Sequence, residues 1–226
     1  VLYIPEKARY SYLLQLPERE DVQQAVIQAM KDIETENTSL KDVLPKQYKR
    51  VPKDILISLL KTFSEIEMEE NNGDTFGAIY EYFLGKFASS EGQKGGEFFT
   101  PTSLVRLIVE ILEPYKGKLL DPACGSCGMF VQSAKFVNRH SGNANQDISI
   151  FGQENIADTV RLGKMNLAVH GLEGDVKECN TYYQNIHGCY QKMNYIMANP
   201  PFNAKGVDKE RVKGDKRYPF GIPKND

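Results

Sequence analysis

The first part of the chain has apolar residues at helical spacing, three or four positions apart. This pattern predicts three helices, over residues 17–34, 54–66 and 76–87. Pro17 suits the first position of a helix, and Asp54 and Asp74 are candidate caps for the second and third helices. Residues 1–90 are therefore predicted to form an N-terminal helical domain, whose simplest role is packing without chemistry.

The pattern changes after residues 89–96, a connector rich in glycine, serine and charged residues. Short apolar runs then alternate with helical periods, which predicts βαβ units and a largely parallel sheet. The expected strands are 118–121, 148–152, a weak one within 174–183, and 195–198, and the expected helices begin after Thr102, at 131 and after Asn155. We therefore expect an α/β fold in which residues 91–226 form a Rossmann-like domain, with residues 203–226 as a mobile loop.

Composition and charge limit the setting and the partners of the protein. The apolar runs are far shorter than a membrane span, and the N-terminus lacks the basic-then-apolar pattern of a signal peptide. We therefore expect a cytoplasmic protein with reduced cysteines and no membrane partner. The formal net charge is −2, so any grip on a nucleic acid is expected to be local or shared with a partner.

The stretch from Asp121 to Phe130 places small residues between an expected strand and an expected helix. In an open α/β sheet, nucleotide-like ligands bind at such a turn. Small residues admit the ligand to the backbone, and the start of the helix offers free N–H groups. A βα turn without a ligand has the same local pattern, so the turn alone does not establish a site.

Cys124 and Cys127 in this turn also suggest other chemistry. A Cys-x-x-Cys pair occurs in redox proteins, and Cys-Gly-Ser-Cys occurs around papain-type nucleophiles, but there an aromatic residue follows where this chain has Gly128. A zinc site would need a second ligand pair, and Cys179 and Cys189 are poorly spaced for one. We interpret both turn cysteines as small residues and expect no metal site.

Three further segments carry groups suited to a nucleotide or a planar amine. Glu154 follows the second expected strand, where a carboxylate can accept both hydroxyl hydrogens of a ribose. Residues 97–102 place aromatic rings beside a hydroxyl. Residues 199–202, Asn-Pro-Pro-Phe, combine an amide oxygen, outward carbonyls and a flat ring, which suits an exocyclic amine on a planar base. Each segment has a structural alternative: a solvated helix cap, core residues with a cap, and a turn.

Taken together and in order, these motifs resemble those of the amino-methylating DNA methyltransferases. They are Gly-Glu-Phe-Phe-Thr-Pro (96–101), Asp-Pro-Ala-Cys-Gly-Ser-x-Gly-x-Phe (121–130), Gly-Gln-Glu (152–154) and Asn-Pro-Pro-Phe (199–202). More narrowly, the chain resembles the modification subunit of type I restriction-modification systems, which makes N6-methyladenine. Residues 77–82, Gly-Ala-Ile-Tyr-Glu-Tyr, are similar to that family's N-terminal helical domain. The resemblance covers nearly the whole chain.

The resemblance implies S-adenosylmethionine as the methyl donor and gives each motif a role. The segment that would enclose the methionine end of the cofactor comprises Glu97, Phe98, Phe99, Thr100, Pro101 and Thr102. The residues that would hold the rest of the cofactor are Asp121, Gly125, Ser126 and Cys127 in the turn, Glu154 at the ribose and Asn180 at the adenine edge. The residues that would bind the target adenine are Asn199, Pro200, Pro201 and Phe202. Cys127 departs from the glycine or alanine common in the family, and we expect its thiol to fit while narrowing the pocket.

The resemblance also implies partners: DNA, a specificity subunit that reads the target sequence, a second modification subunit and a restriction subunit. The family's sheet has further strands, so the catalytic domain is expected to be truncated after its fourth strand. Val1 in place of a start methionine and the polar end at Asp226 likewise suggest a piece of a longer protein. Two alternatives stay open: a protein-glutamine methyltransferase, in which a tyrosine typically replaces Phe202, and a non-catalytic assembly module that keeps the fold.

Overall fold

The computed structural model describes residues 2–17, 19–64, 75–90, 99–201 and 206–222. Within it the chain divides into two compact units, Val1–Thr75 and Phe76–Asp226. None of the described helices combines the length and the apolar composition of a membrane span.

The first unit is helical, as its periodicity predicts. Its described elements are the 3-10 turns η1 (Glu6–Ala8), η2 (Thr38–Leu40) and η3 (Tyr48–Arg50) and the helices α1 (Tyr10–Leu14), α2 (Val22–Glu36) and α3 (Lys53–Ser64). Apolar side chains of α2, including Val26 and Ala29, pack with Leu56 of α3 in a small buried cluster. Burial of these side chains from water holds the short helices together.

Two expected helix starts in this unit are wrong. The Asp21 side chain accepts hydrogen bonds from the N–H groups of Gln23 and Gln24, so α2 begins at Val22 and not near Pro17. Helix α3 begins at Lys53, which places Asp54 inside the first turn instead of at the cap. The third expected cap, Asp74, lies outside the described residues.

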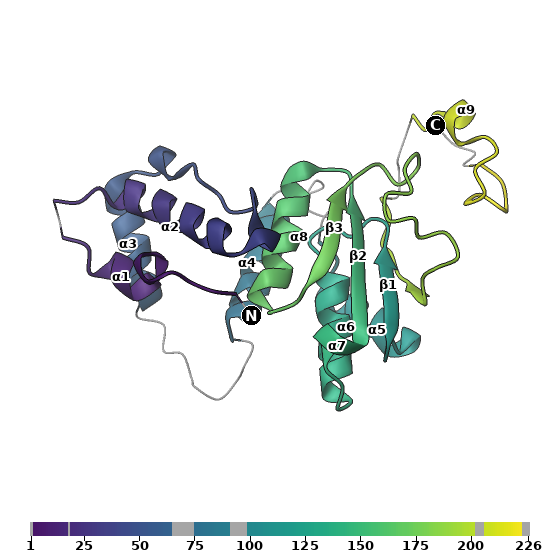
Figure 1. Cartoon of the computed structure of the whole chain (residues 1–226), viewed down its shortest axis with the longest axis horizontal. Helices are drawn as coiled ribbons and strands as arrows, with labels where there is room; N and C mark the ends of the chain where they lie inside the picture. The colour runs from purple at the N-terminus through teal and green to yellow at the C-terminus, as the bar shows by residue number, and fades with distance from the viewer. Residues whose placement is uncertain (1, 18, 65–74, 91–98, 202–205, 223–226) are drawn as a thin grey trace. The chain divides into compact units, whose positions relative to one another are not determined.

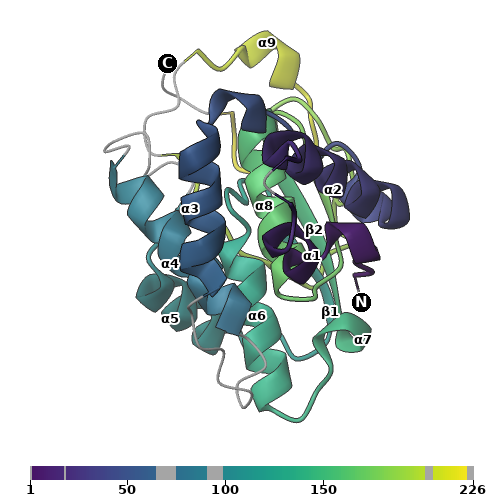
Figure 2. The same ribbon diagram turned by 90° about the vertical axis from the view of Figure 1, so that its left-hand side faces the viewer.

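The second unit is an α/β layer structure, which confirms the expected fold class. Its elements are α4 (Thr75–Ser90), α5 (Thr102–Leu112), β1 (Gly117–Asp121), α6 (Gly128–Arg139), α7 (Ala144–Asp147), β2 (Ile148–Glu154), α8 (Ala157–Val169), β3 (Gly174–Glu178), β4 (Tyr195–Ile196) and α9 (Lys209–Val212). The described strands form one parallel sheet in the order β3-β2-β1-β4. Figures 1 and 2 show α6 and α8 on one side of this sheet.

The core of the second unit lies between the sheet and these helices. Leu119 of β1 and Phe130 and Val131 of α6 are fully buried, and Ile150 of β2 and Val176 of β3 join the same cluster. Parallel pairing aligns Asp121 with Gly152, and Gly152 with Val176. The carboxyl ends of β1, β2 and β3 therefore meet at one edge, where a doubly wound sheet binds its ligands.

Several boundaries in the second unit differ from their predictions. Helix α6 starts at Gly128, directly after the turn, and Thr102 is the first residue of α5 and not its cap. The cap position of α8 is Ile156, because Asn155 lies outside the helix. The expected loops gain the short helices α7 and α9 because Asn143 and Asp208 cap their first turns.

The division between the units also falls earlier than expected. The periodicity predicts α4 within the helical domain of residues 1–90, whereas nearly all of this helix belongs to the second compact unit. The Tyr80 hydroxyl donates a hydrogen bond to the carbonyl oxygen of Leu162 in α8 at 3.2 Å. Helical periodicity marks a buried face but does not say which neighbour buries it.

Candidate functional site

The turn between β1 and α6 is wound tightly by its own backbone. Gly125 and Cys127 both adopt positive φ, at 50° and 65°. The Cys124 N–H donates to the carbonyl oxygen of Gln153 in β2 at 2.9 Å, and the Cys127 N–H donates to the carbonyl oxygen of Cys124 at 2.8 Å. These bonds hold the small residues of the turn in place directly before the first turn of α6.

Cys127 does not narrow the pocket, contrary to expectation. Its side chain is fully buried, and a Cβ atom placed on Gly163 of α8 would lie only 2.6 Å from its Sγ atom. The thiol therefore occupies the space that Gly163 leaves open. Cys124 lines the pocket instead, and its hydrogen bond to Cys127 together with burial raises the pKa of the Cys124 thiol well above its usual range. A neutral thiol is a poor nucleophile, which agrees with reading Cys124 as a small residue of the turn.

Asp121 ends β1 with a carboxyl group almost wholly removed from solvent. Burial and the negative charge of Glu154 raise its pKa to about 7, although the N–H of Ala123 donates to its Oδ1 atom at 3.0 Å and favours the charged form. The group is thus balanced between its two protonation states near neutral pH.

Glu154 is the last residue of β2 and joins the turn to α8. Its Oε2 atom accepts from the N–H of Gly125 at 3.1 Å, and its Oε1 atom accepts from the N–H groups of Asn155 and Ile156 at 2.7 and 3.0 Å. A carboxylate has about four acceptor positions. These bonds therefore fix the orientation of Glu154 and leave room at Oε2 for one further donor.

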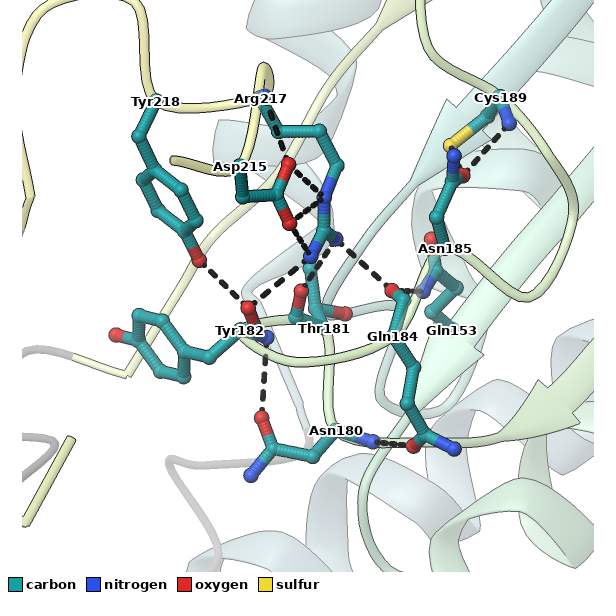
Figure 3. A network of polar contacts seen from close by, with 10 residues as sticks. All are labelled: Gln153, Asn180, Thr181, Tyr182, Gln184, Asn185, Cys189, Asp215, Arg217 and Tyr218. Carbon is teal, nitrogen blue, oxygen red and sulfur yellow. Dashed lines mark hydrogen bonds and ion pairs between the residues drawn. The ribbon is translucent and has the colours of Figure 1, made fainter. Parts of the chain in front are cut away.

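The loop after β3 is tied to the same turn. The Thr181 hydroxyl donates to the carbonyl oxygen of Pro122 at 2.5 Å. On its other side, the Arg217 guanidinium donates to the carbonyl oxygens of Thr181, Tyr182 and Gln184 and pairs with Asp215 (Figure 3). Residues 206–222, expected as part of a mobile loop, are thereby anchored beside Asn180.

Asn199 and Thr100 meet in the lining of a pocket. The Asn199 Nδ2 atom donates to the Thr100 hydroxyl oxygen at 3.0 Å, although the two residues are far apart in sequence. The space at the pocket is about 320 Å³, open solvent included, and it is lined by Thr100, Val105, Asp121, Ala123, Cys124, Gly125, Ser126, Gly128, Met129 and Asn199. It unites three of the predicted motifs in one cavity.

The other predicted site residues lie around this pocket or outside the described part of the chain. Phe99 and Thr102 line a second pocket beside it. Pro101, Pro200 and Pro201 are exposed. Glu97, Phe98 and Phe202 fall outside the described residues. No group of three or more His, Cys, Asp and Glu side chains in the described ranges is arranged to hold a metal ion.

Comparison with known proteins identifies the family. The profile of N-6 DNA Methylase matches residues 71–226. The chain belongs to the N-6 DNA methylase family. This confirms the resemblance drawn from the motifs.

Relatives of this N-6 DNA methylase chain are longer than the chain itself. The type I restriction enzyme HindI methylase subunit of Haemophilus influenzae is 42% identical and aligns with 84% of this chain and 46% of its own length. The MjaIX methylase subunit of Methanocaldococcus jannaschii is 39% identical over 95% of this chain and 39% of its own length. A type I restriction-modification methyltransferase subunit from Streptococcus thermophilus shares the fold, with a TM-score of 0.79 at 20% identity, over 97% of this chain and 49% of its own. The chain thus spans less than half the length of each.

Two polar residues of this N-6 DNA methylase chain were missed by sequence reasoning. Asn166 of α8 is 1% exposed, and its Nδ2 atom donates to the carbonyl oxygen of Ser126 in the turn at 2.8 Å. Glu81 of α4 lines the second pocket together with Asn166. Glu81 belongs to the motif of residues 77–82, which predicts a helical domain and not a binding site. Asn166 is a polar residue beside the apolar face of α8, and such a residue gives no local signal of burial.

Proposed function

We propose that this protein transfers a methyl group from S-adenosylmethionine to the N6 amine of adenine in DNA, as the modification subunit of a type I restriction-modification complex. The observation that carries this proposal is the hydrogen bond between Asn199 and Thr100 at the pocket of the β1–α6 turn. It joins the segment suited to a planar amine to the segment suited to a nucleotide-like cofactor. The proposed partners are DNA, a specificity subunit, a second modification subunit and a restriction subunit, and the proposed location is the cytoplasm.

The pocket residues fit S-adenosylmethionine. Gly125 and Ser126 present backbone at the start of α6, and Glu154 keeps one acceptor position for a ribose hydroxyl. A second ribose hydroxyl would replace one of the N–H groups that Glu154 now binds. Asn180 stands on the loop tied to Pro122, where it is proposed to meet the adenine edge. When bound, the cofactor supplies an electrophilic methyl group.

The proposed role of Asn199 follows from the direction of its amide. Because Nδ2 donates to Thr100, the Oδ1 atom is left as an acceptor for the amine of the target base. A base inside a duplex must first be extruded to reach such a site, and Phe202 is proposed to stack on it. Asn199 Oδ1 and the Pro200 carbonyl oxygen would then accept the two amine hydrogens. This contact makes the nitrogen lone pair available, and positioning supplies the rest of the catalysis.

Replacing Asn199 with alanine tests this proposal. The Asn199→Ala variant is expected to bind S-adenosylhomocysteine within about twofold of the parent and to lose about a hundredfold in methyl transfer, because one positioned acceptor is removed. Tritium transfer to adenine-containing DNA is measured with the specificity partner present, and Asn145→Ala, at an exposed surface position, is the control. Transfer at the parental rate by Asn199→Ala contradicts the proposal, as does label that passes to protein glutamine and not to DNA.

A further inference from the structure

A second pocket lies beside the first and is lined in part by α4. The space there is about 270 Å³, open solvent included, and it is lined by Glu81, Leu84, Phe99, Thr100, Thr102, Val105, Ser126, Gly128, Gln132 and Asn166. Thr100, Val105, Ser126 and Gly128 line both pockets, so the two pockets are direct neighbours. A ligand seated in the first pocket therefore has one end next to the second.

Asn166, which lines the second pocket, has a buried side-chain oxygen without a hydrogen-bond partner in the described part of the chain. Asn166 is 1% exposed, and its Nδ2 atom is committed to the carbonyl oxygen of Ser126. Among the described residues, nothing donates to its Oδ1 atom. A buried acceptor left in this way costs free energy, which a donor arriving with a ligand would recover.

Glu81 adds a negative charge to the same wall. Three side chains approach its Oε1 atom: Gln132 Nε2 at 3.3 Å, Lys135 Nζ at 3.5 Å and His170 Nε2 at 3.7 Å. Its Oε2 atom takes part in none of these contacts. Gln132 and Lys135 therefore tie the carboxylate to α6 through one oxygen. In the described ranges, no hydrogen bond to the other oxygen is found, so this oxygen can accept from a ligand.

We propose that Glu81 and Asn166 bind the α-ammonium group of the amino-acid end of S-adenosylmethionine. An ammonium group carries one positive charge and several donors, which matches a carboxylate oxygen and an unpaired amide oxygen. The inference rests on the proposed function and adds to it the residues that recognise this end of the cofactor. Asp121, the buried carboxyl of the first pocket, is the rival acceptor for the same group.

The test compares two ligands that differ only in this group. They are S-adenosylhomocysteine and its analogue in which hydrogen replaces the α-amino group. Their dissociation constants are measured by calorimetry for the parent, Glu81→Gln and Asp121→Asn. Glu110→Gln is the matched control, because it loses a carboxylate that pairs helix α5 with Arg139 of α6 outside both pockets.

The parent is expected to bind S-adenosylhomocysteine at least about tenfold more tightly than the analogue, and Glu81→Gln is expected to bring that ratio close to one. Glu110→Gln and Asp121→Asn should keep the parental ratio. If Glu81 only ties α4 to α6, Glu81→Gln would weaken the binding of both ligands equally and leave the ratio of their dissociation constants unchanged. That result would overturn the inference. The inference is also overturned if the ratio falls to about one in Asp121→Asn but stays at the parental value in Glu81→Gln.

Two further readouts keep the outcomes distinct. Thermal melting is recorded for every variant. If Glu81→Gln does not fold, Glu81→Asp replaces it. The ratio is expected to be lower in Glu81→Asp than in the parent, because the aspartate side chain is one methylene shorter and its carboxylate lies farther from the ligand. An unchanged ratio in Glu81→Asp counts against the inference. A parent that binds neither ligand contradicts the proposed function itself, whereas binding with an unaltered ratio contradicts only the role of Glu81.

Discussion

At the scale of single residues, Asp121 links the site to the stability of the protein. Burial and the charge of Glu154 raise its pKa from an ordinary 3.8 to about 7. Between these values the folded protein holds a proton that the unfolded chain has lost. The contribution of Asp121 to the free energy of unfolding therefore falls as pH rises through this window, by about 1.4 kcal/mol per pH unit, and levels off above the folded pKa.

Asp121→Asn is expected to remove this contribution. Its free energy of unfolding, measured by urea denaturation from about pH 5 to pH 8, should decline less with rising pH than that of the parent. Asp158→Asn is the control, because Asp158 pairs with Arg161 on the surface and its side chain is 85% exposed. Parallel pH profiles for Asp121→Asn and the parent would show that Asp121 is ionised in the folded protein.

At the scale of elements, one loop connects two parts of the site. Arg217 fixes residues 181–184 by donating to three of their carbonyl oxygens, and Thr181 ties the same loop to Pro122 of the turn (Figure 3). The Tyr218 hydroxyl adds a bond to the carbonyl oxygen of Tyr182 at 2.8 Å. The planar fork of the guanidinium reaches several acceptors at once, which a lysine ammonium cannot reproduce.

Arg217→Ala is therefore expected to loosen this loop and to weaken cofactor binding. Amide hydrogen exchange of residues 180–184 should speed up, and the dissociation constant for S-adenosylhomocysteine should rise by about tenfold, with Arg217→Lys behaving similarly. Lys216→Ala, which removes the same charge from the neighbouring exposed position, should match the parent. Unchanged exchange and affinity in Arg217→Ala would mean that the loop holds its shape without the arginine.

At the scale of the whole molecule, the division after Thr75 assigns α4 to the second unit. The helix buries Leu84, bonds Tyr80 to the carbonyl oxygen of Leu162 and places Glu81 beside Gln132. A cut at the connector after residue 90, where composition changes most, would separate these groups from the site.

Two truncations distinguish the boundaries. A chain of residues 76–226 is expected to exceed a chain of residues 91–226 by at least about 2 kcal/mol in free energy of unfolding, because burial of Leu84 alone is worth about that much. Urea denaturation measures the difference, and calorimetry with S-adenosylhomocysteine follows the site. Equal stability and equal binding of the two chains would place the functional boundary after residue 90.

The sequence by itself determined the fold class, the strand order along the chain and the motifs of the family. Short apolar runs and helical periods record burial, and the motif around Asp121 is contiguous, so both are readable locally. Tertiary structure decided what depends on packing between distant segments. Cys127 lies against Gly163 because that glycine leaves space. Glu154 accepts hydrogen bonds both from Gly125 in the turn and from Ile156 before α8. Glu81 lines the second pocket because α4 packs there. Each of these depends on a neighbour that is remote in sequence, which no local pattern specifies.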